Sequence, residues 1–192
     1  VAPQSPKALL AAFDRETGET RWVLPMGAEK GGYVSPMLAT IGGVDQILMA
    51  TANDKRDASF QGRVVGVEAA TGKLLWEYLG WQCQIPIAPP TAIGDGRIFI
   101  TGGYDAGSAM IKVTAEGGAF KVEELFTTRE CNSQTHPPII ADGYLYVNSN
   151  SNSARDGMIC MSLDGKLMWK TQSNPWFERG GHIMIDGLIV NQ

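Results

Sequence analysis

Short apolar runs alternate along the chain with glycine-containing turns. Runs such as Ile98-Phe99-Ile100 and Leu145-Tyr146-Val147 place apolar side chains on both faces of an extended segment, as a strand covered on both sides requires. The turns between runs contain residues that adopt φ > 0 in tight hairpins. These turns are Thr17-Gly18, Gly42-Gly43, Thr71-Gly72, Asp95-Gly96, Gly117-Gly118, Asp142-Gly143, Asp164-Gly165 and Asp186-Gly187. The pattern predicts an all-β chain of antiparallel strands joined by short hairpins.

One stretch of this pattern recurs along the chain. Three segments repeat one another and a fourth is a degraded copy: 11–22, 66–76, 161–169 and 112–126. Each copy closes on an aromatic residue, and these residues are Trp22, Trp76, Trp169 and Phe126. The steps along the chain are 54, 50 and 43 residues. A period of roughly 40–50 residues is that of one four-stranded propeller blade, so we predict a β-propeller.

The position of the closing aromatics is explained by packing between blades. Each would lie on the outermost strand of a blade, where a large ring can cross the gap to the next blade and bury apolar area there. We therefore expect Trp22, Trp76 and Trp169 to be largely buried against the neighbouring unit, with Phe126 in the equivalent place. A role for the three tryptophans in stacking on a cofactor is the less favoured interpretation.

The segment Ala12-Phe13-Asp14-Arg15-Glu16-Thr17-Gly18-Glu19-Thr20-Arg21-Trp22 resembles the tryptophan-docking motif of the pyrroloquinoline-quinone-like (PQQ-like) β-propellers. The match is good at 12–22 and 66–76, partial at 159–169 and poor at 110–126. The resemblance implies a propeller of seven or eight blades. Members include quinoprotein alcohol dehydrogenases and the periplasmic propeller of the outer-membrane protein assembly machine. The motif is specific for the fold and weak for function.

The repeat divides the chain into blades within a single domain, 1–192. The expected units are a partial blade, three whole blades and a second partial blade: 8–22, about 33–78, 87–126 and 135–170, and 181–192. The chain would then supply about half a ring, with the rest missing from this sequence or supplied by another chain. The alternative is a closed four-bladed ring, in which 181–191 pairs onto 8–22.

Composition excludes some partners. The 192 residues have a formal net charge of −4, with 44% hydrophobic and 19% charged residues, and show no basic stripe that could neutralise nucleic-acid phosphates. No apolar run approaches the 18 residues of a membrane span. No signal peptide is visible, but the resemblance implies a bacterial protein in the periplasm or another extracytoplasmic compartment.

Three cysteines, Cys83, Cys131 and Cys160, show neither Cys-x-x-Cys nor vicinal spacing. Cys160 lies inside an apolar strand and is expected to be a small buried side chain. Cys83 and Cys131 occupy nearly the same place in successive units, so a disulfide between them is one possibility and free thiols are the other. A metal site of these two cysteines with His136 is a third and less favoured interpretation.

The long loops are expected on the opposite rim from the short hairpins, and function on a propeller concentrates in such loops. They are 51–61, 102–107 and 148–156 within blades, and 23–33, 79–88, 127–136 and 171–181 between blades. Two of their segments, 53–57 and 148–153, are expected to be solvated. The candidate residues for a ligand or partner are Asp54, Arg56, Trp81, Cys83, Arg129, Cys131, His136, Trp176, Arg179 and His182.

Two functional classes remain. The favoured hypothesis is a non-enzymatic, extracytoplasmic binding or scaffold module that holds a protein partner or a small ligand on the long-loop rim, without cofactor or metal. The alternative is a quinoprotein alcohol dehydrogenase-like enzyme that uses PQQ and calcium. The resemblance implies that such an enzyme would carry adjacent cysteines against the quinone and a set of acidic and amide calcium ligands. Neither is assignable here, so any catalytic residues would lie outside this sequence.

Overall fold

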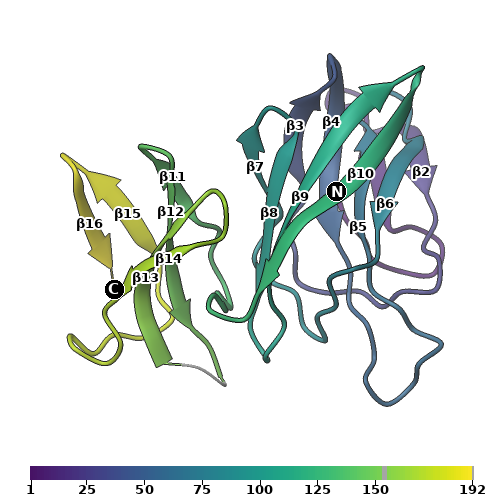
Figure 1. Ribbon diagram of the computed structural model, residues 1–192. Coiled ribbons are helices and arrows are strands. Elements are labelled where there is room, and N and C mark those ends of the chain that lie inside the picture. The colour runs from purple at the N-terminus through teal and green to yellow at the C-terminus, as the bar shows by residue number, and fades with distance from the viewer. Residues whose placement is uncertain (153–154, 192) are drawn as a thin grey trace.

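The computed structural model describes residues 1–152 and 155–191, and these contain strands and turns but no helix. Five antiparallel sheets follow one another along the chain (Figure 1). The N-terminal hairpin comprises β1 (Leu10–Phe13) and β2 (Thr20–Leu24). The first blade comprises β3 (Met37–Ile41), β4 (Val44–Ala50), β5 (Val64–Glu68) and β6 (Leu74–Tyr78).

Two further blades and a second hairpin complete the described chain. The second blade comprises β7 (Thr91–Gly94), β8 (Arg97–Gly102), β9 (Gly107–Glu116) and β10 (Ala119–Thr128). The third comprises β11 (Ile139–Ala141), β12 (Tyr144–Asn150), β13 (Arg155–Ser162) and β14 (Leu167–Lys170). The C-terminal hairpin comprises β15 (His182–Ile185) and β16 (Leu188–Asn191). In each blade the strands lie in sequence order, so each pairs with its neighbours in the chain.

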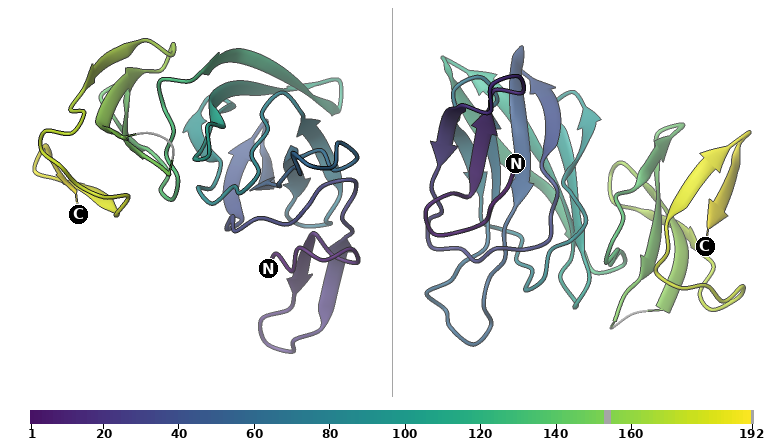
Figure 2. Two further views of the ribbon diagram at one scale, coloured as in Figure 1. Left: turned by 90° about the horizontal axis from the view of Figure 1, so that it is seen from below. Right: turned by 180° about the vertical axis from the view of Figure 1, so that it is seen from behind.

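The blades are arranged side by side along an open arc, with the two hairpins at its ends (Figure 2). The N-terminal and C-terminal hairpins form separate two-stranded sheets. The alternative of a four-bladed ring, in which 181–191 would pair onto 8–22, is therefore not seen in this structure. No helix in the described residues is long and apolar enough to cross a membrane.

Apolar side chains fill the seams between adjacent sheets. One cluster joins the N-terminal hairpin to the first and second blades, through residues such as Leu10, Leu48 and Ile111. A second cluster joins the second and third blades, through Phe99 and Ile159 among others. The central strands of the blades, such as β5 and β8, are buried on both faces because a neighbouring sheet covers each side, as the apolar runs predicted.

Two of the four closing aromatics dock as expected. The Trp22 ring lies over Gly72 of the first blade, where a Cβ would come within 2.6 Å of it, and its Nε1 donates to the Ala69 carbonyl at 3.0 Å. Phe126 lies over Gly165 of the third blade in the same way, at 2.8 Å from the Cβ position. Both glycines have positive φ, so the receiving turn needs glycine for its backbone as well as for the space.

The other two aromatics depart from the expectation. Trp76 is only 5% exposed, but its ring lies over Gly66 of its own blade and its Nε1 donates to Gln46 Oε1 at 2.6 Å. The tip of the second blade, at Gly118, has nothing within 4 Å of its Cβ position and so does not receive Trp76. Trp169 is 44% exposed, and the prediction that it is largely buried is wrong.

Candidate binding rim

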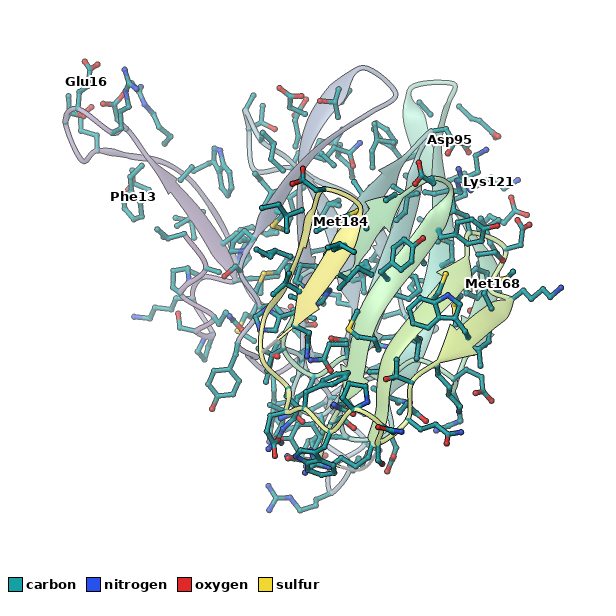
Figure 3. All side chains as sticks on the ribbon, turned by 90° about the vertical axis from the view of Figure 1, so that its left-hand side faces the viewer. Phe13, Glu16, Asp95, Lys121, Met168 and Met184 are labelled. Atoms are coloured by element: carbon teal, nitrogen blue, oxygen red, sulfur yellow. The ribbon has the colours of Figure 1, made fainter. Side chains whose placement is uncertain are left out.

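The two rims differ as the loop lengths predicted. Short hairpin turns lie at one end of the sheets, where Glu16 and Asp95 project in Figure 3, and the longer loops lie at the other. A cavity of about 480 Å³ lies on the long-loop rim, at the seam between the first and second blades. Its lining is Asn53, Lys55, Gly80, Trp81, Gln82, Gln84, Tyr104, Asp105, Ala106, Ser108, Thr127, Thr128 and Arg129.

Trp81 forms the fixed wall of this cavity. It is 3% exposed, and its Nε1 donates to the Gly107 carbonyl of the second blade at 3.2 Å. Its ring lies so close to Gly102 that a Cβ there would come within 2.8 Å. Trp81 was a candidate residue for a ligand or partner in the inter-blade loop 79–88, and in the structure its indole makes a contact between two blades. It still presents one side to the cavity.

Hydrogen-bonded polar side chains line the part of the cavity wall that Trp81 does not form. Gln82 accepts a hydrogen bond from the Gly62 amide at 2.9 Å and donates to the Gly62 carbonyl at 2.7 Å, so its amide cannot rotate freely. Asn53 Oδ1 is buried and has no hydrogen-bond partner among the described residues. A buried acceptor without a donor costs free energy, so this oxygen is available to a ligand donor.

Two cations flank the cavity. Lys55 and Arg129 are both exposed, and Arg129 Nη1 donates to the Asp105 carbonyl at 2.9 Å. Tyr104 and Asp105, on the same loop as that carbonyl, have φ of 58° and 60°. Two consecutive non-glycine residues in the left-handed region are uncommon and carry backbone strain. The loop therefore holds a costly conformation at the cavity, which favours a binding role.

Asp54 and Arg56 belong to the support of this rim. Lys30 and the Arg56 amide donate to the buried Asp54 carboxylate, and these hydrogen bonds lower the pKa of Asp54 to about 2. Lys30 Nζ also lies 4.4 Å from the centre of the Phe60 ring. Asp54 therefore fixes the 51–61 loop from within, which corrects the solvated interpretation of that residue, whereas the Arg56 side chain is exposed.

The three cysteines are free and buried. The Cys83 thiol faces the Gly103 carbonyl at 3.8 Å, and Cys131 lies 3.9 Å from Thr101 Oγ1. Burial raises the pKa of both thiols to about 11. The disulfide between Cys83 and Cys131 is not formed. No group of three or more metal-binding side chains occurs in 1–152 and 155–191, so Cys83, Cys131 and His136 do not converge on a metal site.

The remaining candidates lie at the next seam, between the third blade and the C-terminal hairpin. The rings of His136 and His182 meet edge to face at 6.2 Å, and burial lowers the pKa of His182. Arg179 donates to Gln134 and Asn152 from the facing loops. Trp176 is exposed and lies 5.0 Å from the Arg155 guanidinium. These residues join the blade to the hairpin.

Buried asparagines were missed by the sequence analysis. Asn148 and Asn150 lie on β12 and are buried, although 148–153 was expected to be a solvated loop. Their side-chain amides donate to carbonyls of the 177–180 loop, with Asn148 reaching Glu178 at 3.0 Å and Asn150 reaching Phe177 at 2.8 Å. One feature of the sequence could have indicated this burial: the asparagines directly follow an apolar run. Polar side chains in that position can donate hydrogen bonds to the backbone carbonyls of a neighbouring loop.

The chemistry of the rim suits binding. The only hydroxyl among the buried cavity side chains is Ser108, whose Oγ lies 2.8 Å from Thr101 Oγ1 and 2.9 Å from the Cys131 carbonyl, with no base beside it in the described residues. Nucleophilic catalysis needs a base within hydrogen-bond reach of the hydroxyl. The cavity is lined by cations, amides, hydroxyls and aromatic side chains, which are groups that can recognise a ligand.

The comparisons with known proteins agree with this architecture. The sequence profile of the family described as outer membrane protein assembly factor BamB matches residues 2–172. Among solved structures, BamB from Moraxella catarrhalis is similar, with a TM-score of 0.53, 20% identity, and coverage of 83% of this chain and 45% of that one. A likeness at that identity shows the fold, and this chain spans less than half of that structure. A comparison with curated protein sequences finds no significant match.

Proposed function

The chain belongs to the family of the outer membrane protein assembly factor BamB, and we propose that it is a non-enzymatic binding module that holds a protein partner on its long-loop rim, outside the cytoplasm. The family match and the propeller fold support a scaffold role. The observation that carries the proposal is the cavity of about 480 Å³ between Trp81 and the strained loop at Tyr104.

The lining of that cavity favours an extended acidic segment as the partner's contact. Lys55 and Arg129 would attract carboxylates, while the unpaired Asn53 Oδ1 would accept a hydrogen bond from a backbone amide. The Tyr104 and Trp81 rings supply apolar surface beside these polar groups. Such a mixture of few polar anchors and aromatic walls is typical of peptide and ligand sites.

The residues present do not fit a PQQ and calcium centre. The quinoprotein alternative requires two adjacent cysteines, whereas no two of the three cysteines of this chain are adjacent in the sequence, and Cys83 and Cys131 belong to different core clusters. No group of three or more His, Cys, Asp or Glu side chains that could hold a metal ion is found among the described residues. We therefore derive no catalytic step through that cofactor, and a dehydrogenase would need residues beyond this sequence.

The test is complementation in the bacterium that carries the gene, with the amount of folded outer-membrane protein as the readout. The rim variant Lys55→Glu/Arg129→Glu should lower that amount in a strain lacking the gene product. Its matched control, Lys73→Glu/Lys166→Glu, changes the same charge at exposed positions near the hairpin turns and should restore it fully. Protease treatment of spheroplasts should degrade the protein if it lies outside the cytoplasm.

Each outcome bears on one part of the proposal. If loss of the gene product leaves outer-membrane proteins unchanged, the assembly role is refuted. If the rim variant and its control perform equally, the long-loop rim is not the contact surface. Full protection from protease in spheroplasts would place the protein inside the cytoplasm and refute the compartment.

A further inference from the structure

The two histidines of the chain meet at one seam. His136 lies just before β11 of the third blade, and His182 is the first residue of β15 in the C-terminal hairpin. Their ring centres are 6.2 Å apart and the ring planes cross at 83°. A Cβ on Gly181 would lie 3.5 Å from His136 Cε1, so the hairpin packs closely on this ring. Histidine is the side chain whose charge ordinarily changes between about pH 5 and 8, and both copies stand at this contact.

The His182 ring is enclosed without a hydrogen-bond partner. Both Nδ1 and Nε2 are buried, and neither is hydrogen-bonded among the described residues. The residues that enclose the two nitrogens belong to this sequence, so the enclosure does not depend on what precedes or follows it. A buried polar atom without a partner is uncommon and costs free energy. Packing therefore holds this imidazole in place, and hydrogen bonds do not.

The surroundings of His182 disfavour a positive charge on its ring. Burial lowers the pKa of His182 from its ordinary value of 6.5, and the neighbouring His136 imidazole lowers it further. The Tyr146 backbone on β12 lies near the ring without a hydrogen bond of normal geometry, and it opposes part of this shift. The neutral form of the ring is therefore the one that fits the seam.

The charged side chains on the neighbouring segments are engaged elsewhere. Glu178 of the 171–181 loop pairs with Arg155 at 3.2 Å, and Asp156 of β13 pairs with Lys170 at 3.2 Å. Arg179 donates to side-chain oxygens of the facing loops, and β16 carries no ionisable side chain. None of these ion pairs includes an imidazole, so a proton on the buried ring would find no counter-charge among the described residues.

We propose that this seam is a pH-sensitive latch, in which protonation of His182 releases the C-terminal hairpin from the third blade. A charged ring beside a second imidazole needs water, and movement of β15 away from the blade gives it that access. Other contacts across the seam do not titrate, such as the hydrogen bond from the Thr135 hydroxyl to the Arg179 carbonyl at 2.8 Å. Release therefore changes the long-loop rim at the third blade, while the cavity between the first and second blades stays intact.

The direction of the response follows from the lowered pKa of His182. In the released hairpin the ring regains its ordinary pKa of 6.5, so the released state binds the proton more tightly than the latched state. The contact is then fully present above about pH 6.5 and weakens as the pH falls below that value. Between about pH 7.5 and about pH 5.5 the equilibrium constant for release can rise by at most about tenfold.

Hydrogen exchange of the whole chain, read by mass spectrometry and corrected for intrinsic rates, measures the release. Between about pH 7.5 and about pH 5.5, amides of 182–191 should lose about 3–10-fold in protection, while those of β4 should keep theirs. His182→Phe keeps a flat ring that takes no proton and should abolish the difference. His136→Phe is the matched control and should retain most of it, because burial is the larger cause. EDTA in every sample excludes a metal ion held by the two imidazoles.

Nuclear magnetic resonance titration supplies an independent test. In His136→Phe the one remaining histidine signal is that of His182, so the reading does not require His182→Phe to fold. The pKa of His182 should lie below 6.5 in this variant and in the unmodified chain. A pKa at or above 6.5, equal protection of 182–191 at both pH values, or a loss of protection that persists in His182→Phe would each overturn the proposal.

Discussion

Trp76 offers the sharpest test of how the blades are held together. Its indole is 5% exposed, lies over Gly66 and donates a hydrogen bond of 2.6 Å to the fully buried Gln46 side chain. Replacement by alanine would open a cavity in the cluster that joins the first and second blades and leave Gln46 Oε1 without its donor. Both effects act on the folded state.

The magnitude follows from these two contributions. Truncation of a buried aromatic to alanine costs about 3–5 kcal/mol. An orphaned buried acceptor costs about 1–3 kcal/mol, and the two overlap because both arise from the same vacated space. We expect Trp76→Ala to lower the free energy of unfolding by about 4–6 kcal/mol. The control is Trp176→Ala, where a ring 59% exposed contacts Arg155 and its loss should cost about 1 kcal/mol or less.

Urea denaturation followed by circular dichroism measures the loss in free energy of unfolding for Trp76→Ala and for Trp176→Ala. Trp76→Phe separates the contributions, because it keeps most of the packing and removes only the donor, and should cost about 1–3 kcal/mol. Adding Gln46→Leu should cost less than the sum of the single changes, since it removes the orphaned oxygen. If Trp76→Ala costs no more than Trp176→Ala, the reasoning is refuted.

Three further outcomes are expected. Gly72→Ala should destabilise the chain by about 1–3 kcal/mol more than Gly43→Ala, because both glycines have positive φ but only Gly72 lies under the Trp22 ring; equal urea midpoints would contradict the docking account. Hydrogen bonds lower the folded pKa of Asp54 from 3.8 to about 2, so the stability that they provide should be complete above about pH 4 and disappear as pH falls to about 2. Asp54→Asn should lose this pH dependence, and an unchanged acid-unfolding profile would show that the Lys30 contact is unimportant. Thiol titration should find little reaction in the folded chain at pH 8 and three thiols after unfolding without reductant, whereas a single thiol would reveal a disulfide.

Much of the fold could be predicted from the sequence because the propeller is repetitive. A turn glycine and a closing aromatic recur at a blade-length period, and glycine adopts the positive φ of these turns without the steric cost that other residues carry. The docking of Trp22 on Gly72 and of Phe126 on Gly165 follows from that repetition, because the aromatic and the glycine stand at fixed places in the repeat. The placement of the long loops on one rim follows too, because strands alternate in direction.

The candidate site was predicted only as a region. Sequence analysis named Trp81 and Arg129 as candidates, and both line the cavity, but it did not predict that the Trp81 indole is buried against Gly102. It missed Asn53 and Tyr104. Polar residues in irregular loops carry no periodic signal, so their approach to one another depends on how two blades pack.

The sequence by itself determined the blade repeat, the turns and the direction in which each aromatic can dock, because these depend on residues close in the chain. Only the tertiary structure decided which partner each aromatic finds. Trp76 turns to Gln46 of its own blade, and Trp169 remains exposed because the described sheet beside it has two strands. Asn148 is buried for the same kind of reason: a loop thirty residues further along the chain brings the carbonyls that its amide satisfies. Such contacts are set by the packing of one blade on the next, which no single repeat encodes.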